Sequence, residues 1–290
     1  MYNKKKLTIY LAWAFGLAWT LQIIASYFAN QGNAGAFQGI MAVSMFAPLV
    51  AVVLSKTGIK TLGWRPIFKG HLGTLLIAWF WPAVLCVLGG ALYFVLFPAA
   101  LDTEMSMMDA QMAVAGAENS GIAMQQIVML NVLTGLTMGP LINTFAAVGE
   151  EAGWRGVMYP MLKERFGTTK GRVLGGCIWG AWHWPVMILA GYEYGSSYWG
   201  APLTGMLAFC VFATSAGILL DWVYEKTACI WYPALAHGAI NACANLPTLM
   251  LNPLYADKLL LGPLMIGLIS GIPLLITAVW ICLRNKKVSE

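Results

Sequence analysis

The chain has few charged residues, and this shortage excludes an ordinary soluble protein. Only 10% of its 290 residues are Asp, Glu, Lys or Arg, whereas 59% are hydrophobic. Soluble domains contain about 25% charged residues, because polar groups must cover a water-facing surface. Most of the exterior must therefore face lipid. The apolar segments run throughout the chain, so we expect a single transmembrane domain over residues 1–290.

Several chemical signatures are also missing. The six cysteines lie singly and form no C-x-x-C pair, which argues against disulfides and thiolate metal sites. Lys and Arg form no stripe interleaved with aromatic residues, so no nucleic-acid partner is expected. The sequence shows no Ser-His-Asp or Cys-His signature and no H-E-x-x-H zinc-protease helix.

What the sequence does contain is a series of long apolar runs. A transmembrane helix needs about 20 mainly apolar residues, and in lipid the backbone must satisfy its own hydrogen bonds. We therefore predict an all-α, polytopic membrane protein, and we expect the first run to be retained because it is too long for a signal-peptide core. The eight predicted transmembrane helices are 7–29, 37–55, 71–98, 122–149, 172–190, 202–222, 228–249 and 260–283.

The distribution of basic residues predicts the orientation. Lys and Arg concentrate in the cytoplasmic loops of membrane proteins. With eight spans and a cytoplasmic N-terminus, every Lys and Arg except Lys258 falls on the cytoplasmic side. A wrong number of spans would mix the two groups, so we predict that the N- and C-termini are both cytoplasmic.

A few ionisable and polar residues lie inside or at the ends of these apolar segments. A charged group there costs about 2.5–3.5 kcal/mol and usually marks function. The chain has only three histidines, and two of them fall in predicted spans, while His71 lies at a span boundary. The candidate site residues are Glu150, Glu151, Arg155, His183, His237 and Asn241.

Three of these residues are predicted to lie at one depth. Counted from a Lys or Arg that anchors the same helix in the cytoplasm, His183 and His237 each lie eleven residues along and Glu150 lies thirteen. At a rise of about 1.5 Å per residue, these separations are about 16 to 20 Å. We therefore expect the three side chains to meet in the cytoplasmic half of the membrane.

Helical spacing also predicts which side chains share a face. Glu151 and Arg155 are four residues apart and can form an ion pair, and His237 and Asn241 have the same spacing. Taken singly, each residue has a structural explanation, such as an ion pair, an interhelical hydrogen bond or helix packing. Their coincidence on three helices favours a functional site.

Amide hydrolysis is a reaction that this set could perform. A carboxylate and a histidine can activate water, and a second histidine with an asparagine amide can donate hydrogen bonds to a developing oxyanion. Two histidines and one glutamate could instead hold a metal ion with an open position for water. The sequence alone leaves these two mechanisms open.

The motifs around these residues resemble those of a known family. Residues 150–155 match E-E-x-x-x-R, Trp179 and His183 match aromatic-x-x-x-His, and residues 237–241 match H-x-x-x-N. In this order, over about residues 145–245, they resemble the CAAX-protease and bacteriocin-processing (CPBP) family, also called the Abi or type II CAAX prenyl endopeptidase family. Trp179 stands where that family usually has Phe.

The resemblance implies an intramembrane endopeptidase. By analogy, Glu150 would be the principal water-activating base, assisted by His183, while His237 and Asn241 would stabilise the oxyanion. In eukaryotic and archaeal-type relatives the substrate is a prenylated C-terminal CAAX peptide. Bacterial relatives are linked to bacteriocin immunity or to peptide-signal processing, and nothing in this sequence favours a prenylated substrate.

The same resemblance implies supporting and cofactor roles. Glu151 and Arg155 would orient the catalytic groups. Because the family is often described as metalloproteases, Zn²⁺ or another divalent metal is an expected cofactor, with Glu150, His183 and His237 as its ligands. The mechanism would then be metal-dependent rather than purely glutamate-dependent.

The expected partner is a peptide or protein substrate reached from the membrane or its cytoplasmic leaflet. We expect a multi-pass protein of the bacterial plasma membrane. One alternative is a non-enzymatic immunity or scaffold protein with the same fold. Another is a proton-coupled transporter, which the small number of membrane carboxylates and the lack of paired broken helices disfavour.

Overall fold

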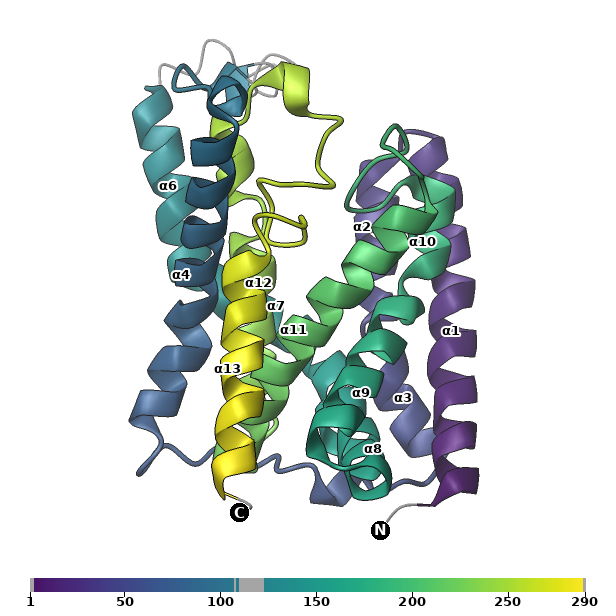
Figure 1. Ribbon diagram of the computed structural model, residues 1–290. Helices are drawn as coiled ribbons and strands as arrows, with labels where there is room; N and C mark the ends of the chain where they lie inside the picture. Colours follow the sequence, from purple (N-terminus) through teal and green to yellow (C-terminus); the bar gives the residue numbers. More distant parts are fainter. Residues whose placement is uncertain (1–2, 107, 110–122, 289–290) are drawn as a thin grey trace.

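The structure, a computed structural model, describes residues 3–106, 108–109 and 123–288. Over these residues the regular structure is helical, and the only strand-like pairing is an isolated bridge between Leu101 and Leu251. Figure 1 shows the longer helices running side by side between two ends of the molecule. This arrangement confirms the all-α, polytopic membrane fold.

Most of the predicted spans correspond to long helical stretches. Among the described residues, five stretches are long and apolar enough to cross a bilayer, and two helices bent by 44° at a short break make a sixth if they are counted as one span. The five are α1 (Lys4–Asn30), α2 with α3 (Ala34–Ser44 and Ala47–Leu54), α4 (Leu72–Leu96), α9 with α10 (Thr168–Trp182 and Trp184–Ala190) and α11 (Leu203–Thr227). The bent pair joins α6 (Met124–Leu136) to a helix made of α7 (Met138–Gly153), a π-helical turn (Trp154–Met158) and α8 (Tyr159–Phe166).

The last two predicted spans are shorter in the structure. Helix α12 (Trp231–Cys243) has 13 residues and α13 (Ile272–Val288) has 17. The predicted helical start at residue 260 is wrong, because residues 256–271 form irregular turns. Residues 262–267 are apolar yet buried in the protein, which is where non-helical backbone is tolerated at membrane depth. Their apolar composition is therefore similar to that of a transmembrane helix, which explains the wrong prediction.

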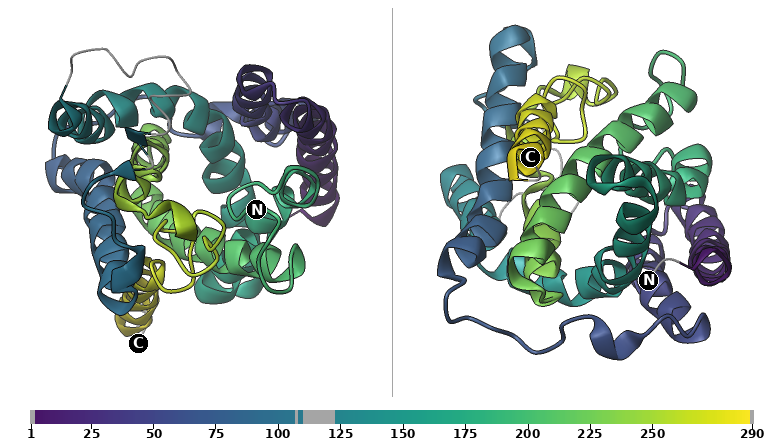
Figure 2. Two further views of the ribbon diagram at one scale, coloured as in Figure 1. Left: turned by 90° about the horizontal axis from the view of Figure 1, so that it is seen from above. Right: turned by 60° about the horizontal axis from the view of Figure 1, so that its bottom comes forward.

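Both ends of the chain lie at the same end of the molecule. Figure 1 shows the start of α1 and the end of α13 at the end where α8 turns into α9, and Figure 2 brings this end forward. The segments gathered there carry most of the basic residues, in agreement with the sorting of Lys and Arg by the eight predicted spans. The orientation relative to the cytoplasm stays a prediction.

Glycines allow the helices that carry the histidines to pack closely. A Cβ atom at Gly238, next to His237, would lie 2.6 Å from the Pro140 carbonyl oxygen of α7. A Cβ atom at Gly180, three residues before His183, would lie 2.8 Å from the Cα atom of Cys210 in α11. Small residues at helix interfaces are typical of membrane proteins, because close backbone approach maximises packing contacts. These contacts fix α12 on α7 and α9 on α11.

Candidate active site

Glu150 lies near the end of α7, where it is only 2% exposed. Its Oε2 atom accepts a hydrogen bond of 3.0 Å from the indole Nε1 of Trp154, one helical turn further along. The same oxygen accepts a second bond, of 2.6 Å, from Nε1 of Trp179 in α9. Two neutral donors from two helices therefore hold one oxygen of this carboxylate in place.

Glu151 lies beside Glu150 and orients a histidine. Its Oε1 atom is 3.0 Å from Nη1 of Arg155 and 2.8 Å from Nδ1 of His237 on α12. The predicted Glu151–Arg155 ion pair is therefore present, and it also extends to the third motif. The Arg155 guanidinium lies over the rings of Tyr159 and Trp179, at 4.8 and 4.5 Å from their centroids. Such cation–π contacts stabilise a cation in a buried setting.

A π-helical turn follows directly after the two glutamates, at Trp154–Met158. π-Helical turns are rare and occur frequently at functional sites, because the extra residue changes the direction of the side chains that follow. Trp154 and Arg155, the first two residues of this turn, are both buried and both contact the glutamate pair. The π-helical turn therefore positions two side chains that hold the glutamate pair in place.

His183 lies at a break in a membrane helix. It separates α9 from α10, and Pro185 lies in the first turn of α10. The His183 backbone N–H bonds to the Gly180 carbonyl, which leaves the Trp179 carbonyl available for Nδ1 of the His183 ring, at 3.1 Å. The break therefore both positions the ring and supplies a hydrogen-bond partner for it.

These hydrogen bonds determine which nitrogen of each histidine is available to a substrate. The Trp179 carbonyl can only accept, so Nδ1 of His183 donates to it. The ionised carboxylate of Glu151 likewise accepts from Nδ1 of His237. In a neutral ring the other nitrogen, Nε2, is then an acceptor and can take a proton. Once His237 is protonated beside Glu151, its Nε2 becomes a donor.

The predicted catalytic residues line one cavity of about 340 Å³. Glu150 from α7, His183 from the break after α9, and His237 and Asn241 from α12 all contribute to its wall. This volume is within the range of about 300–1,000 Å³ that is typical of ligand pockets. The expected convergence of these residues on one cavity is therefore present in the structure, while the depth of the cavity in the membrane and the catalytic role of each residue stay predictions.

The cavity does not have the geometry of a metal site. Glu, His and His are chemically suitable ligands for zinc. However, among the described residues no group of three or more His, Cys, Asp or Glu side chains is arranged to hold a metal ion. One oxygen of Glu150 is already bound to two indole N–H groups. Because these side chains as placed do not fit the expected metal, no reaction step is derived through one.

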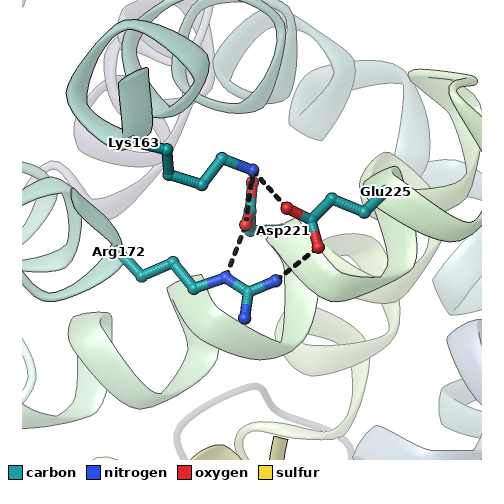
Figure 3. A network of polar contacts seen from close by, with 4 residues as sticks. All are labelled: Lys163, Arg172, Asp221 and Glu225. Carbon is teal, nitrogen blue, oxygen red and sulfur yellow. Dashed lines mark hydrogen bonds and ion pairs between the residues drawn. The ribbon is translucent and has the colours of Figure 1, made fainter. Parts of the chain in front are cut away.

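Four charged side chains form a second group, in which Arg172 and Asp221 are fully buried. Figure 3 shows Lys163 of α8 and Arg172 of α9 facing Asp221 and Glu225 of α11. Lys163 Nζ lies 2.8 Å from Asp221 and 2.7 Å from Glu225, while Arg172 lies 2.6 and 2.7 Å from the same two carboxylates. We call these four residues the α8–α9–α11 ion cluster.

The ion cluster left only a partial signal in the sequence. Asp221 and Glu225 are four residues apart on one helix, which predicts a shared face. Their partners come from two other helices, which the sequence alone could not identify. The cluster joins the turn between α8 and α9 to α11, so it fixes the helices that carry Trp179 and His183.

Fold and site together define a class: a polytopic helical membrane protein with a glutamate and two histidines around an internal cavity. The family model described as "Type II CAAX prenyl endopeptidase Rce1-like" matches residues 132–243. This segment contains all three motifs and overlaps the expected core of about 145–245. The match covers less than half of the chain, and over this motif-bearing segment the chain is similar to the type II CAAX endopeptidases that the model describes.

A curated relative supports the same assignment. CAAX prenyl protease 2 of Methanococcus maripaludis is 25% identical to this chain over 126 residues, which cover 36% of this chain and 46% of the relative. The match thus spans about half of the relative's length.

Proposed function

We propose that the chain is an intramembrane endopeptidase of the plasma membrane. It hydrolyses a peptide bond in a membrane-associated or C-terminal, CAAX-like peptide with water activated by Glu150 and His183. The observation that carries the proposal is the convergence of Glu150, His183, His237 and Asn241 on one cavity. The family match to type II CAAX endopeptidases supports the same reaction class.

In the proposed first step, water attacks the peptide carbonyl carbon. Glu150 accepts the water proton, with Nε2 of His183 as a second acceptor. Protonated His237 and the Asn241 amide donate hydrogen bonds to the oxyanion of the tetrahedral intermediate. Glu151 stabilises the His237 cation through the contact at Nδ1, as a carboxylate does for histidine in other hydrolases.

In the proposed second step, the intermediate collapses and the C–N bond breaks. Glu150 returns the proton to the leaving nitrogen, so that the products are a carboxylic acid and an amine, which ionise to a carboxylate and an ammonium group. The water supplies the hydroxyl group of the new acid, and no oxidant or other co-reactant is needed.

Substrate entry from the bilayer is part of the proposal. The wall of the cavity includes Gln38 and Ala42 of α2, and both are exposed on the molecular surface. Helix α2 belongs to a stretch long enough to cross the membrane. A peptide held in the lipid could therefore approach the cavity beside α2 without first dissolving in water.

Purified protein in detergent or liposomes provides the test. A panel of membrane-associated peptides is incubated with wild type, Glu150→Gln and His183→Ala, and products are identified by mass spectrometry. We expect cleavage by wild type and a loss of at least about 100-fold in either variant, the lower range for one acid–base group. Full activity in both folded variants contradicts the proposed roles of Glu150 and His183. A folded wild type that cleaves none of the peptides contradicts the peptidase proposal and favours the immunity or scaffold alternative.

The expected metal has a separate test. Elemental analysis of active protein and activity after chelator treatment distinguish a metal-dependent reaction from one that uses Glu150 and histidine alone. Bound stoichiometric zinc together with chelator-sensitive cleavage would support the metal-dependent mechanism, with Glu150 binding the metal through the oxygen that accepts no indole bond.

A further inference from the structure

A second carboxylate, that of Glu193, lines the same cavity as Glu150. It comes from the turn between α10 and α11 rather than from the family motifs. None of the described residues that line this cavity is Lys or Arg. The Glu193 carboxylate therefore shares the cavity with the Glu150 carboxylate, and no Lys or Arg of the described wall pairs with either.

The turn that carries Glu193 is closely held. The Tyr194 backbone N–H donates to the Tyr192 carbonyl at 3.0 Å, and the Gly195 N–H donates to the Gly191 carbonyl at 2.8 Å. The Tyr194 hydroxyl donates to the Ile266 carbonyl at 2.7 Å, and Ile266 also lines the cavity. The position of Glu193 is thus fixed relative to the cavity wall.

The backbone of Glu193 is in the left-handed region, with φ at 72°. Glycine adopts this conformation readily, whereas a glutamate does so at a cost. Non-glycine residues held in such conformations cluster at functional sites, where the surrounding structure compensates for the strain. A carboxylate at this position is therefore better explained by what it binds than by the needs of the turn.

The Glu193 carboxylate has the neutral Tyr192 hydroxyl as a hydrogen-bond partner, but no Lys or Arg of the described cavity wall faces it. Burial raises the pKa of Glu193. The nearby negative charge of Glu193 raises the pKa of the Tyr192 hydroxyl, and the Tyr192 ring lies parallel to the His183 ring at 6.4 Å. A bound cation would stabilise the charged form of Glu193, because an opposite charge within a few ångströms favours ionisation.

We propose that Glu193 is a specificity residue that binds an organic cation of the peptide substrate, either a Lys or Arg side chain or a free α-ammonium group. The proposal rests on the proposed peptidase function of the same cavity. Glu193 rather than Glu150 takes this role because one oxygen of Glu150 already accepts two indole N–H bonds. A free substrate carboxylate close to Glu193 is correspondingly disfavoured.

The test uses the full-length protein in detergent and peptides that differ at one position, with Lys, its neutral isostere norleucine, or Glu. We expect wild type to prefer the Lys peptide over the norleucine peptide by at least about tenfold in kcat/KM, as one charge-assisted hydrogen bond allows. Glu193→Gln should reduce this ratio to about twofold or less, and Glu193→Lys should favour the Glu peptide. N-terminal acetylation of each peptide distinguishes an α-ammonium source from a side-chain source.

Glu104→Gln is the matched control, because Glu104 is an exposed carboxylate outside the cavity. It should retain the wild-type ratio. Two ratios are compared, Lys over norleucine peptide and free over N-acetylated peptide. The proposal is overturned if wild type shows neither preference, or if Glu193→Gln leaves both ratios unchanged.

A binding measurement separates this proposal from the peptidase function. Peptide affinity is measured through tryptophan fluorescence in Glu150→Gln, with and without Glu193→Gln, since Trp179 and Trp182 line the cavity. Selective binding of cationic peptides that depends on Glu193, without cleavage by wild type, supports the cation site and contradicts only the hydrolysis. Cleavage by wild type without such selectivity contradicts only the cation site.

Discussion

The α8–α9–α11 ion cluster and the Glu150 cavity place buried charge in opposite settings. In the cluster, each carboxylate faces both Lys163 and Arg172, and all the contacts are between 2.6 and 2.9 Å. In the cavity, the Glu150 carboxylate is held by two neutral indoles, and the buried Arg155 cation pairs with Glu151 instead.

This difference suggests separate roles for the two regions, one in the stability of the fold and the other in the proposed reaction. Buried charges with complementary partners are strongly destabilised when one partner is removed. A carboxylate without a cationic partner gains less from folding, but it remains able to accept a proton from water. We therefore expect the cluster to support the fold and the cavity to support the reaction.

The largest effect on stability is expected from Asp221→Asn. Asp221 and Arg172 are fully buried, so the variant leaves two cations to share the one carboxylate of Glu225. Breaking a buried ion pair typically costs about 3–5 kcal/mol. Equilibrium unfolding in detergent should show this loss, while the folded fraction still cleaves peptide. Unchanged stability would show that the cluster does not hold the helices together.

A smaller effect, on activity, is expected from Trp179→Phe. The variant removes the 2.6 Å indole donor to Glu150 and places at this position the residue that the family usually has. A hydrogen bond to a charged group contributes about 1.5–3 kcal/mol, so kcat should fall by at least about tenfold. Trp64→Phe is the matched control, since that indole donates to the Ile59 backbone carbonyl outside the cavity. An equal kcat in both variants would show that the Trp179 indole does not contribute to catalysis through Glu150.

The smallest effect is expected from Glu225→Gln. The Glu225 side chain is 38% exposed, and Asp221 still faces both cations after the substitution. Partly exposed ion pairs contribute about 0–1 kcal/mol and weaken in salt. The loss measured by unfolding should therefore be below about 1 kcal/mol and should shrink at high ionic strength. A loss as large as that of Asp221→Asn would mean that the four charges act as one unit.

Local spacing predicted much of the site correctly. The Glu151–Arg155 pair follows from helical geometry and is present at 3.0 Å. The presence of His237 and Asn241 in one cavity follows from the same rule. The contact of Trp154 with Glu150 follows from the same four-residue spacing. These relationships lie within single helices, where the chain itself sets the geometry.

Relationships between distant segments could not be derived in this way. Nothing in the local sequence connects Trp179 to Glu150, or Asp221 to Lys163, because helix packing decides these contacts. The segment 260–271 was predicted as helix because a buried loop and a lipid-facing helix can have the same apolar composition. Glu193 fell in a predicted loop, and only the folded chain places it at the cavity.

The central claim is that Glu150 serves the reaction rather than the fold, and Glu150→Gln tests it most directly. Peptide cleavage and the thermal unfolding midpoint are measured on the same preparation of variant and wild type. The account predicts a fall in cleavage of at least about 100-fold, with a midpoint equal to or above that of wild type, because the variant removes a buried carboxylate that has no Lys or Arg partner. Retained cleavage with a lowered midpoint would contradict it.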